Sequence, residues 1–185
     1  MFKKILIIGC GLIGSSILRG SIKKKISKHY FVFEKSKKNI LKIKKINSKI
    51  KILKKLDDKL SDFDFVVLST PMSEYEKIIP NLNKYLNKNC LITDVGSTKE
   101  NILKLKNKKL SKSLDWITSH PISGSEVSGP EHGTKNLFVN KWCVVVSDKN
   151  KIKQSKLLKF WKKLGSNVII MDAKIHDKIF SITSH

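Results

Sequence analysis

Long apolar runs, paired cysteines and a secretion signal are all absent from this 185-residue sequence. No apolar run approaches the roughly 18–20 residues of a membrane-spanning helix, so we expect no membrane span. The basic and then apolar N-terminus breaks into glycines after a short run and has no A-x-A-like cleavage site, which argues against a signal peptide. The three cysteines, Cys10, Cys90 and Cys143, are odd in number and widely spaced, which excludes a disulfide framework and a cysteine metal site. We therefore expect a cytoplasmic protein with reduced, partly buried thiols and no metal.

Arginine is nearly absent, since Arg19 is the only one among 38 basic residues, although the net charge is +23. Clustered cations attract nucleic-acid backbones, but bidentate recognition of bases and phosphates favours arginine. The lysines are also spread over nearly every expected helix. We interpret them as a compositional bias that fills solvated faces, and we do not expect a nucleic-acid partner. A nucleic-acid-binding or NAD-sensing module that uses the lysine surface is the alternative from a different functional class.

Short apolar runs that favour buried strands alternate with amphipathic segments that favour helices. The expected strands are 3–9, 30–34, 49–53, 64–71, 90–96, 116–121, 141–147 and 167–172. Helices are expected after Gly11, at 35–46, at 73–86, from near Thr98 and at 150–164. This alternation predicts an α/β fold with a doubly wound, mostly parallel sheet of the Rossmann type. We assign residues 1–172 to this one domain.

The last segment predicts a further helix. Asp172 is a plausible N-cap, and Ile175, Ile179 and Ile182 follow at helical spacing. No glycine or proline stop signal comes after them. We interpret residues 173–185 as the start of an interrupted helix.

Three glycines stand between the first expected strand and the first expected helix. Gly9, Gly11 and Gly14 form the pattern G-x-G-x-x-G, which permits a tight turn, a close approach of a pyrophosphate and close packing of helix on strand. The helix that follows would direct its N-terminus at the phosphates. We expect the loop and first helical turn to bind a dinucleotide through Gly9, Gly11, Leu12, Ile13 and Gly14; the alternative is a tight turn without a ligand.

Glu34 ends the second expected strand about 20 residues after Gly14, where an acid binds the adenosine ribose hydroxyls and repels a 2′-phosphate. This position favours NAD over NADP, although Lys35, Lys37 and Lys38 are close enough to weaken the preference. A solvated glutamate at a strand end is the alternative.

Two further loops follow expected strands, and in a parallel sheet such loops line the ligand crevice. One contains Ser69, Thr70 and Pro71, and the other contains Ser97 and Thr98. These residues are candidates to contact cofactor or substrate. Capping of the following helices explains the hydroxyl groups equally well.

Residues 118–133 contain no lysine, and His120 lies among them at a strand end. Pro121 restricts the residue before it to extended conformations. A neutral imidazole accepts a proton near pH 7, and a positioned base contributes about 10²–10⁴ in rate. His120 is therefore a candidate general base, with a purely structural histidine as the alternative.

Four segments together resemble the prephenate dehydrogenase family, which includes the arogenate and cyclohexadienyl dehydrogenases of tyrosine biosynthesis. They are GCGLIGSS at 9–16, DVGSTK at 94–99, HPISGSEVSG at 120–129 and HDKIFSITSH at 176–185. The resemblance covers essentially the whole chain but only the nucleotide-binding half of such an enzyme. Ser123, where the family commonly has alanine, is a small departure.

The resemblance implies NAD-dependent oxidative decarboxylation of a small-molecule substrate, prephenate or arogenate. His120 would accept the proton of the ring hydroxyl, and Ser97 would orient both groups. Ser125, Glu126 and His185 would belong to the substrate site. In the family a helical dimerisation domain follows and supplies an arginine for the substrate carboxylate, so we expect a homodimeric complete enzyme and little turnover by this chain alone. Another Rossmann-type NAD(P) dehydrogenase is the alternative within enzymes.

Overall fold

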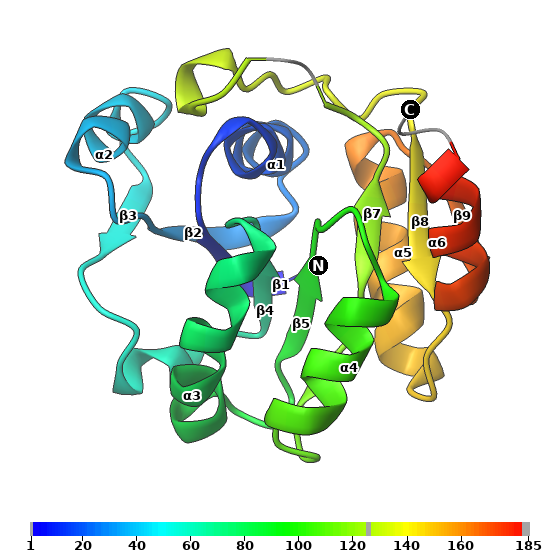
Figure 1. The fold of residues 1–185 in the computed structure, drawn as a ribbon. Helices are drawn as coiled ribbons and strands as arrows, with labels where there is room; N and C mark the ends of the chain where they lie inside the picture. Colours follow the sequence, from blue (N-terminus) through cyan, green and yellow to red (C-terminus); the bar gives the residue numbers. More distant parts are fainter. Residues whose placement is uncertain (1, 125–126, 183–185) are drawn as a thin grey trace.

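A six-stranded parallel sheet with the strand order β3-β2-β1-β4-β5-β6 forms the centre of the computed structural model, which describes residues 2–124 and 127–182 (Figure 1). The strands are β1 (Phe2–Ile8), β2 (Ser27–Phe33), β3 (Ile50–Leu53), β4 (Phe65–Leu68), β5 (Leu91–Asp94) and β6 (Asp115–Trp116). The order reverses between β1 and β4, so the loops after these strands diverge and leave a crevice at their carboxyl ends. The predicted doubly wound parallel fold is confirmed.

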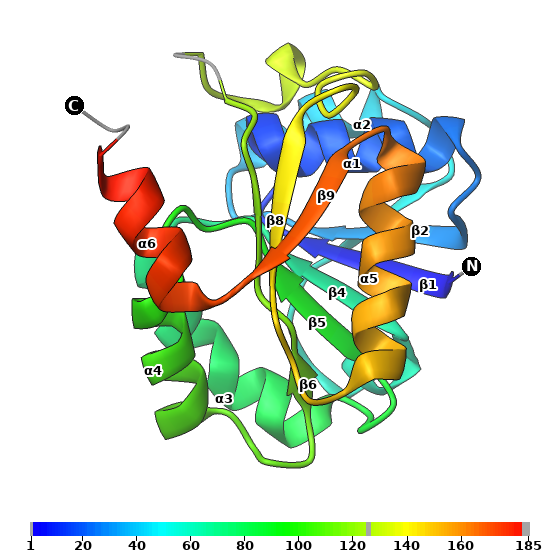
Figure 2. The ribbon, with the colours of Figure 1, turned by 90° about the vertical axis from the view of Figure 1, so that its right-hand side faces the viewer.

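Helices cover both faces of this sheet (Figures 1 and 2). They are α1 (Leu12–Lys23), α2 (Lys37–Lys44), α3 (Tyr75–Tyr85), α4 (Glu100–Lys109) and α5 (Lys151–Leu164). Short 3-10 helices occupy η1 (Asp58–Asp62), η2 (Met72–Glu74) and η3 (Pro130–His132). Each predicted helix is present within a few residues of its expected bounds.

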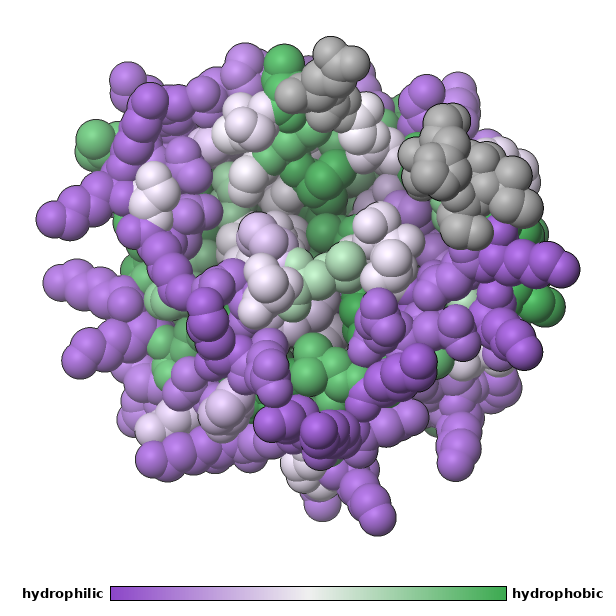
Figure 3. All heavy atoms as spheres, in the orientation of Figure 1, coloured by the Kyte–Doolittle hydropathy of each residue, from purple (hydrophilic) through white to green (hydrophobic). Residues whose placement is uncertain are grey.

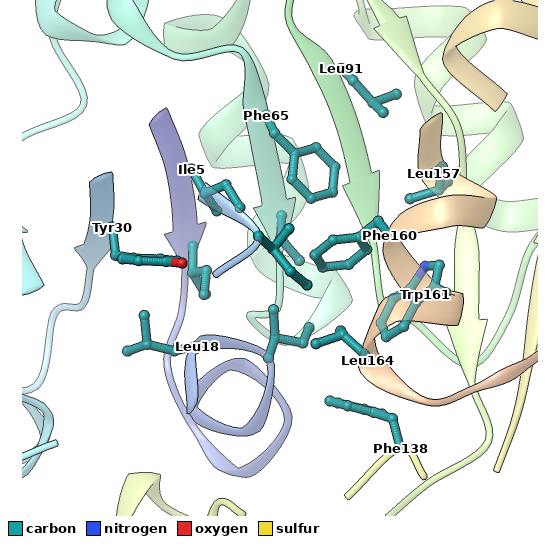
Figure 4. Packing of buried hydrophobic residues seen from close by; sticks show 14 of the residues in the cluster. Ile5, Leu18, Tyr30, Phe65, Leu91, Phe138, Leu157, Phe160, Trp161 and Leu164 are labelled. Carbon is teal, nitrogen blue, oxygen red and sulfur yellow. The ribbon is translucent and has the colours of Figure 1, made fainter. Parts of the chain in front are cut away.

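Successive side chains of a strand point to opposite faces of the sheet, and this explains why helices cover both faces. In β1, Ile5 and Ile7 point to one face and Leu6 and Ile8 to the other, and all four are fully buried. Strand side chains alternate between faces, so a strand that is apolar at every position must be covered twice. Figure 4 shows the first of these two cores, in which aromatic side chains of α5 pack against the central strands.

The expected strand 116–121 is wrong as one element. Its start forms β6, which pairs with β5, whereas Ser119–Pro121 forms β7 of a second sheet with the order β7-β8-β9. There β8 (Trp142–Val146) runs antiparallel to β7 and parallel to β9 (Asn167–Met171). The hydroxyl of Ser119 stays bonded to the carbonyl of Asp94 at 2.7 Å, so the backbone changes partner while the side chain remains attached to β5.

Helix α6 (Ala173–Ile182) follows β9 and lies beside α4 (Figure 2). Asp172 caps it as predicted, with Oδ1 accepting a bond from the Lys174 amide at 2.7 Å. Two isoleucines of the stripe face outward, since Ile175 is 55% exposed and Ile179 44%, whereas His176 is fully buried. No helix in the described residues is long and apolar enough to cross a membrane. The three cysteines are free and wholly buried rather than partly buried.

Candidate active site at the carboxyl ends of the strands

The three motif glycines have different surroundings in the turn between β1 and α1. Gly9 has a φ of +81°, and a Cβ on Gly14 would lie 2.4 Å from the Gly9 carbonyl oxygen. Gly11 has no heavy atom within 4 Å of its would-be Cβ. Gly9 and Gly14 are therefore required by the fold, whereas Gly11 borders open space where a ligand backbone can approach.

The N-terminus of α1 opens onto the same space. Its N-cap is Gly11, which supplies no side-chain cap, and the first amides of a helix have no partner within the helix. These amides suit an anion such as a pyrophosphate. Leu12 and Ile13 form the first turn, and the Ile13 side chain packs against the core.

The loop after β4 holds the glycine turn in place. The Ser69 hydroxyl donates to the Gly9 carbonyl at 2.5 Å. Thr70 Oγ1 is buried without a hydrogen-bond partner in the described part of the chain. Buried polar groups are normally bonded, so this hydroxyl beside the turn fits a polar group of a bound dinucleotide.

One cavity of about 340 Å³ unites most of the predicted cofactor residues. Its lining includes Gly9, Gly11, Glu34, Ser69, Thr70 and Pro71. In the view of Figure 3, hydrophilic side chains project around the rim, while the centre of this face is hollowed and less polar. The cavity therefore brings together predicted residues from the loops after β1, β2 and β4, whereas Ser97 and Thr98 are not among its lining residues.

Glu34 makes two backbone contacts that its sequence position did not indicate. Its carboxylate accepts bonds from the backbone amides of Cys10 at 3.0 Å and Ser36 at 2.9 Å. It thereby joins the end of β2 to the glycine turn while still lining the cavity. Sequence reasoning missed Asn39 and Glu74, which line the same cavity; Glu74 also binds Lys35 at 2.7 Å.

The loop after β5 presents Ser97 and Thr98 as predicted, but they differ in environment. Ser97 is exposed, whereas Thr98 is partly buried with its hydroxyl 3.5 Å from the Met72 sulfur. The next residue, Lys99, is fully buried, and its Nζ lies 2.7 Å from both Asp94 Oδ2 and the Ser119 carbonyl oxygen. Lys99 ends the segment DVGSTK, but nothing in the sequence distinguished it as a buried lysine.

His120 lies one residue beyond Ser119 on β7 and is partly buried. Its Nδ1 is 2.9 Å from Nε2 of His176, and within residues 2–124 and 127–182 no hydrogen bond joins it to Ser97. Burial, followed by the positive charge of Lys99, lowers the pKa of His120 to about 3. The imidazole is therefore neutral near pH 7 and able to accept a proton.

Of the described parts of the lysine-free segment, residues 119–121 form β7, and η3 lies beside α1 and α2 (Figure 1). It packs closely, because a Cβ on Gly133 would lie 2.0 Å from the Ser15 hydroxyl, and the Thr134 amide donates to Ser16 Oγ at 3.0 Å. The proposed substrate residues Ser125, Glu126 and His185 lie outside the described residues.

The arrangement combines a dinucleotide cradle at the carboxyl ends of β1, β2 and β4 with a neutral imidazole on β7, next to the end of β5. Such a combination suits transfer of a hydride coupled to removal of a proton. In the described part of the chain, no group of three or more His, Cys, Asp or Glu side chains could hold a metal ion.

Comparison with known proteins identifies the family. Residues 19–170 match the model of the prephenate dehydrogenase nucleotide-binding domain. This chain belongs to the prephenate dehydrogenase family. It is 33% identical to prephenate dehydrogenase of Lactococcus lactis subsp. cremoris over 99% of this chain and 50% of that protein. It is 27% identical to cyclohexadienyl dehydrogenase of Zymomonas mobilis over 100% of this chain and 64% of that protein.

A solved structure of the same family has the same fold. The prephenate dehydrogenase of Aquifex aeolicus, in complex with hydroxyphenyl propionate and NAD+, superposes with a TM-score of 0.89 at 27% identity. The match covers 100% of this chain and 65% of that one. The chain thus spans between half and two thirds of the length of these relatives.

Proposed function

We propose that this chain is the NAD-binding part of an enzyme that oxidises and decarboxylates prephenate to 4-hydroxyphenylpyruvate. The observation that carries the proposal is that His120, a neutral imidazole, lies beside the end of β5. In the same chain, the glycine turn leaves open space at Gly11 for a dinucleotide. The relation to prephenate and cyclohexadienyl dehydrogenases supports a substrate of this class, with arogenate as the alternative to prephenate.

His120 acts as the general base. Its Nε2 accepts the proton of the ring hydroxyl as the O–H bond breaks and a carbonyl forms at that carbon. NAD, when bound, supplies the acceptor for the hydride that leaves the same carbon. Carbon dioxide then departs from the opposite ring carbon, and the electrons of the broken C–C bond complete the aromatic ring and pass to the carbonyl oxygen, which becomes a phenolate and takes up a proton. Ser97, exposed at the end of β5, would hold the hydroxyl in line, while Ser125, Glu126 and His185 would border the substrate.

The charges around the cavity support NAD over NADP. Glu34 lines the cavity at the end of β2, where a carboxylate binds the ribose hydroxyls and repels a 2′-phosphate. The ammonium of Lys35 is paired with Glu74 at 2.7 Å, so it offers little compensation to an added phosphate.

The test uses the full-length protein, because the proposal concerns the whole enzyme, which we expect to be a homodimer as the resemblance implies. We expect turnover of prephenate with NAD, with lower kcat/KM for arogenate and for NADP. The variant His120→Asn should keep NAD affinity and lose about 10²–10⁴ in kcat. Undiminished turnover by this variant would refute the base assignment. Salt-dependent DNA binding without NAD binding would instead favour the nucleic-acid alternative.

A further inference from the structure

A chain of three side chains leads away from His120 toward the start of α4. His120 Nδ1 lies 2.9 Å from His176 Nε2, and His176 Nδ1 lies 2.7 Å from Asp177 Oδ1. The two imidazole rings meet edge to face, with centroids 5.1 Å apart. His176 and Asp177 belong to the final sequence motif, for which neither residue was assigned a role.

Asp177 is firmly held at the far end of this chain. Its two carboxylate oxygens accept the backbone amides of Lys99 at 2.7 Å and Glu100 at 2.9 Å. Helix α4 has no capping side chain of its own, so Asp177 caps it from α6. Burial alone would raise the pKa of Asp177, but the bonds from Glu100, His176 and Lys99 outweigh burial and lower it.

The proton positions along the chain follow from that carboxylate. Ionised Asp177 can only accept a hydrogen bond, so His176 Nδ1 must donate. Burial lowers the pKa of His176, so its ring is neutral near pH 7 and Nε2 carries only a lone pair. His120 Nδ1 must then donate to His176, which leaves the proton-free lone pair of His120 on Nε2.

The charged groups around His120 and His176 favour the same arrangement, in which both rings are neutral and each Nδ1 donates toward Asp177. Lys99 on the α4 side repels an added proton on either ring, and its own Nζ is engaged by Asp94 and the Ser119 carbonyl. Asp177 supplies the opposing negative charge. A His120 that has accepted a proton can therefore strengthen its bond to His176 and share its charge along the chain toward Asp177.

We propose that His176 and Asp177 are positioning residues that hold His120 in the tautomer protonated at Nδ1, with the Nε2 lone pair directed to the substrate. This proposal rests on the proposed function only in taking His120 as the base. In a serine-protease triad, an amide that enforces the wrong histidine tautomer lowers kcat by about 10⁴. A variant in which His120 is free to adopt either neutral tautomer should lose less, about 10² in kcat.

Two substitutions of His176 separate positioning from packing. His176→Phe fills the buried space and can still pack against Phe180, whose ring centroid lies 4.6 Å from that of His176, but it offers no acceptor to His120. His176→Gln can return a carbonyl oxygen near the position of Nε2. We expect kcat of the full-length enzyme to fall about 10²-fold for Phe and less than 10-fold for Gln, with KM for NAD unchanged. A purely structural role would reverse the order, because phenylalanine suits a buried site better than an amide.

A matched control tests whether destabilising α6 is by itself sufficient to lower kcat. Asp172→Ala removes the N-cap of this helix without touching the three-residue chain, and we expect its kcat to remain within twofold of wild type. A loss as large as that of His176→Phe would overturn the proposal. So would equal kcat values for the Phe and Gln variants.

Nitrogen-15 NMR of the histidine rings reads the tautomer in the 185-residue chain without any turnover. We expect a protonated Nδ1 and a bare Nε2 on His120 in wild type and in His176→Gln, with loss of that preference in His176→Phe. A wild-type His120 protonated at Nε2 would overturn the proposal even if the enzyme is active. If no prephenate or arogenate is turned over, the proposed function fails while the ring shifts still decide the tautomer.

Discussion

A pair of alanine substitutions in the glycine turn separates residues needed by the fold from residues needed by a ligand. In Gly14→Ala the new methyl would lie 2.4 Å from the Gly9 carbonyl oxygen and 2.7 Å from the Ser69 hydroxyl. In Gly11→Ala no heavy atom lies within 4 Å of it. The same chemical change is thus made three residues apart, with opposite steric outcomes.

The magnitudes differ accordingly. Forcing a methyl into a packed site costs about 1–3 kcal/mol, and the better helix propensity of alanine returns up to about 1 kcal/mol. Because one neighbour is backbone and cannot rotate away, we expect Gly14→Ala to lose about 1–2 kcal/mol, a fall in Tm of roughly 2–8 °C for a chain of this size. Gly11→Ala should stay within about 0.5 kcal/mol of wild type.

Dinucleotide affinity should show the reverse order of effects. The Gly11 methyl would enter the space that a pyrophosphate needs, so Kd for NAD should rise at least about tenfold, which is 1.4 kcal/mol. Calorimetric titration with NAD, next to thermal unfolding of the same samples, measures both quantities. Wild-type affinity in a folded Gly11→Ala variant would show that the phosphates do not pass this residue. Wild-type stability of Gly14→Ala would refute the close-packing explanation.

Three further predictions follow from buried charge, from pH and from the exposed serine. Lys99→Met leaves Asp94 buried without its ammonium, 2.7 Å away in wild type, and should lower the free energy of unfolding by about 3–5 kcal/mol; in urea titrations the double variant with Asp94→Asn should lose less. His120 has a pKa of about 3 in the folded chain against about 6.5 for an unperturbed histidine, so the unfolded chain binds the proton first, and the free energy of unfolding should decrease as pH falls from about 6.5 toward 3. Replacing His120 by Gln should flatten that part of the pH profile, and an unchanged profile would contradict the assignment. Ser97→Ala should leave Tm unchanged because the side chain is exposed, while kcat of the full-length enzyme falls about tenfold with the loss of one hydrogen bond; unaltered kcat would remove Ser97 from the site.

The fold was largely predictable because two of its determinants are local. Strands such as β4 (Phe65–Leu68) are short continuous apolar runs, and the glycine spacing identifies the first turn. The break between β6 and β7 was not predictable, because Trp116 and Ser119 are both compatible with a strand. What separates them is the choice of partner, β5 or β8, and pairing partners are not encoded in local periodicity.

The candidate site was predictable where residue type and position coincide, as for Glu34, which lines the expected cavity. It was not predictable where burial makes the difference. Lys99 belongs to the segment DVGSTK, but its burial is evident only from the structure, in which its Nζ lies between Asp94 and the Ser119 carbonyl. His176 begins the last of the four family segments, but the sequence does not show its partner, because only the packing of α6 beside α4 brings it to His120.

The distribution of lysine now has an electrostatic explanation at the site. Each ammonium near His120 opposes its protonation, and Lys99 already contributes to its low pKa. A stronger positive field would make the imidazole too poor a base at neutral pH. Lys99 is compensated by Asp94, and Lys42, which reaches the segment 118–133 from α2, is paired with Glu131. Burial already lowers the pKa of His120, and a segment free of lysine beside it avoids lowering that pKa further. The carboxylate of Asp177 at the end of the histidine pair raises the pKa of His120.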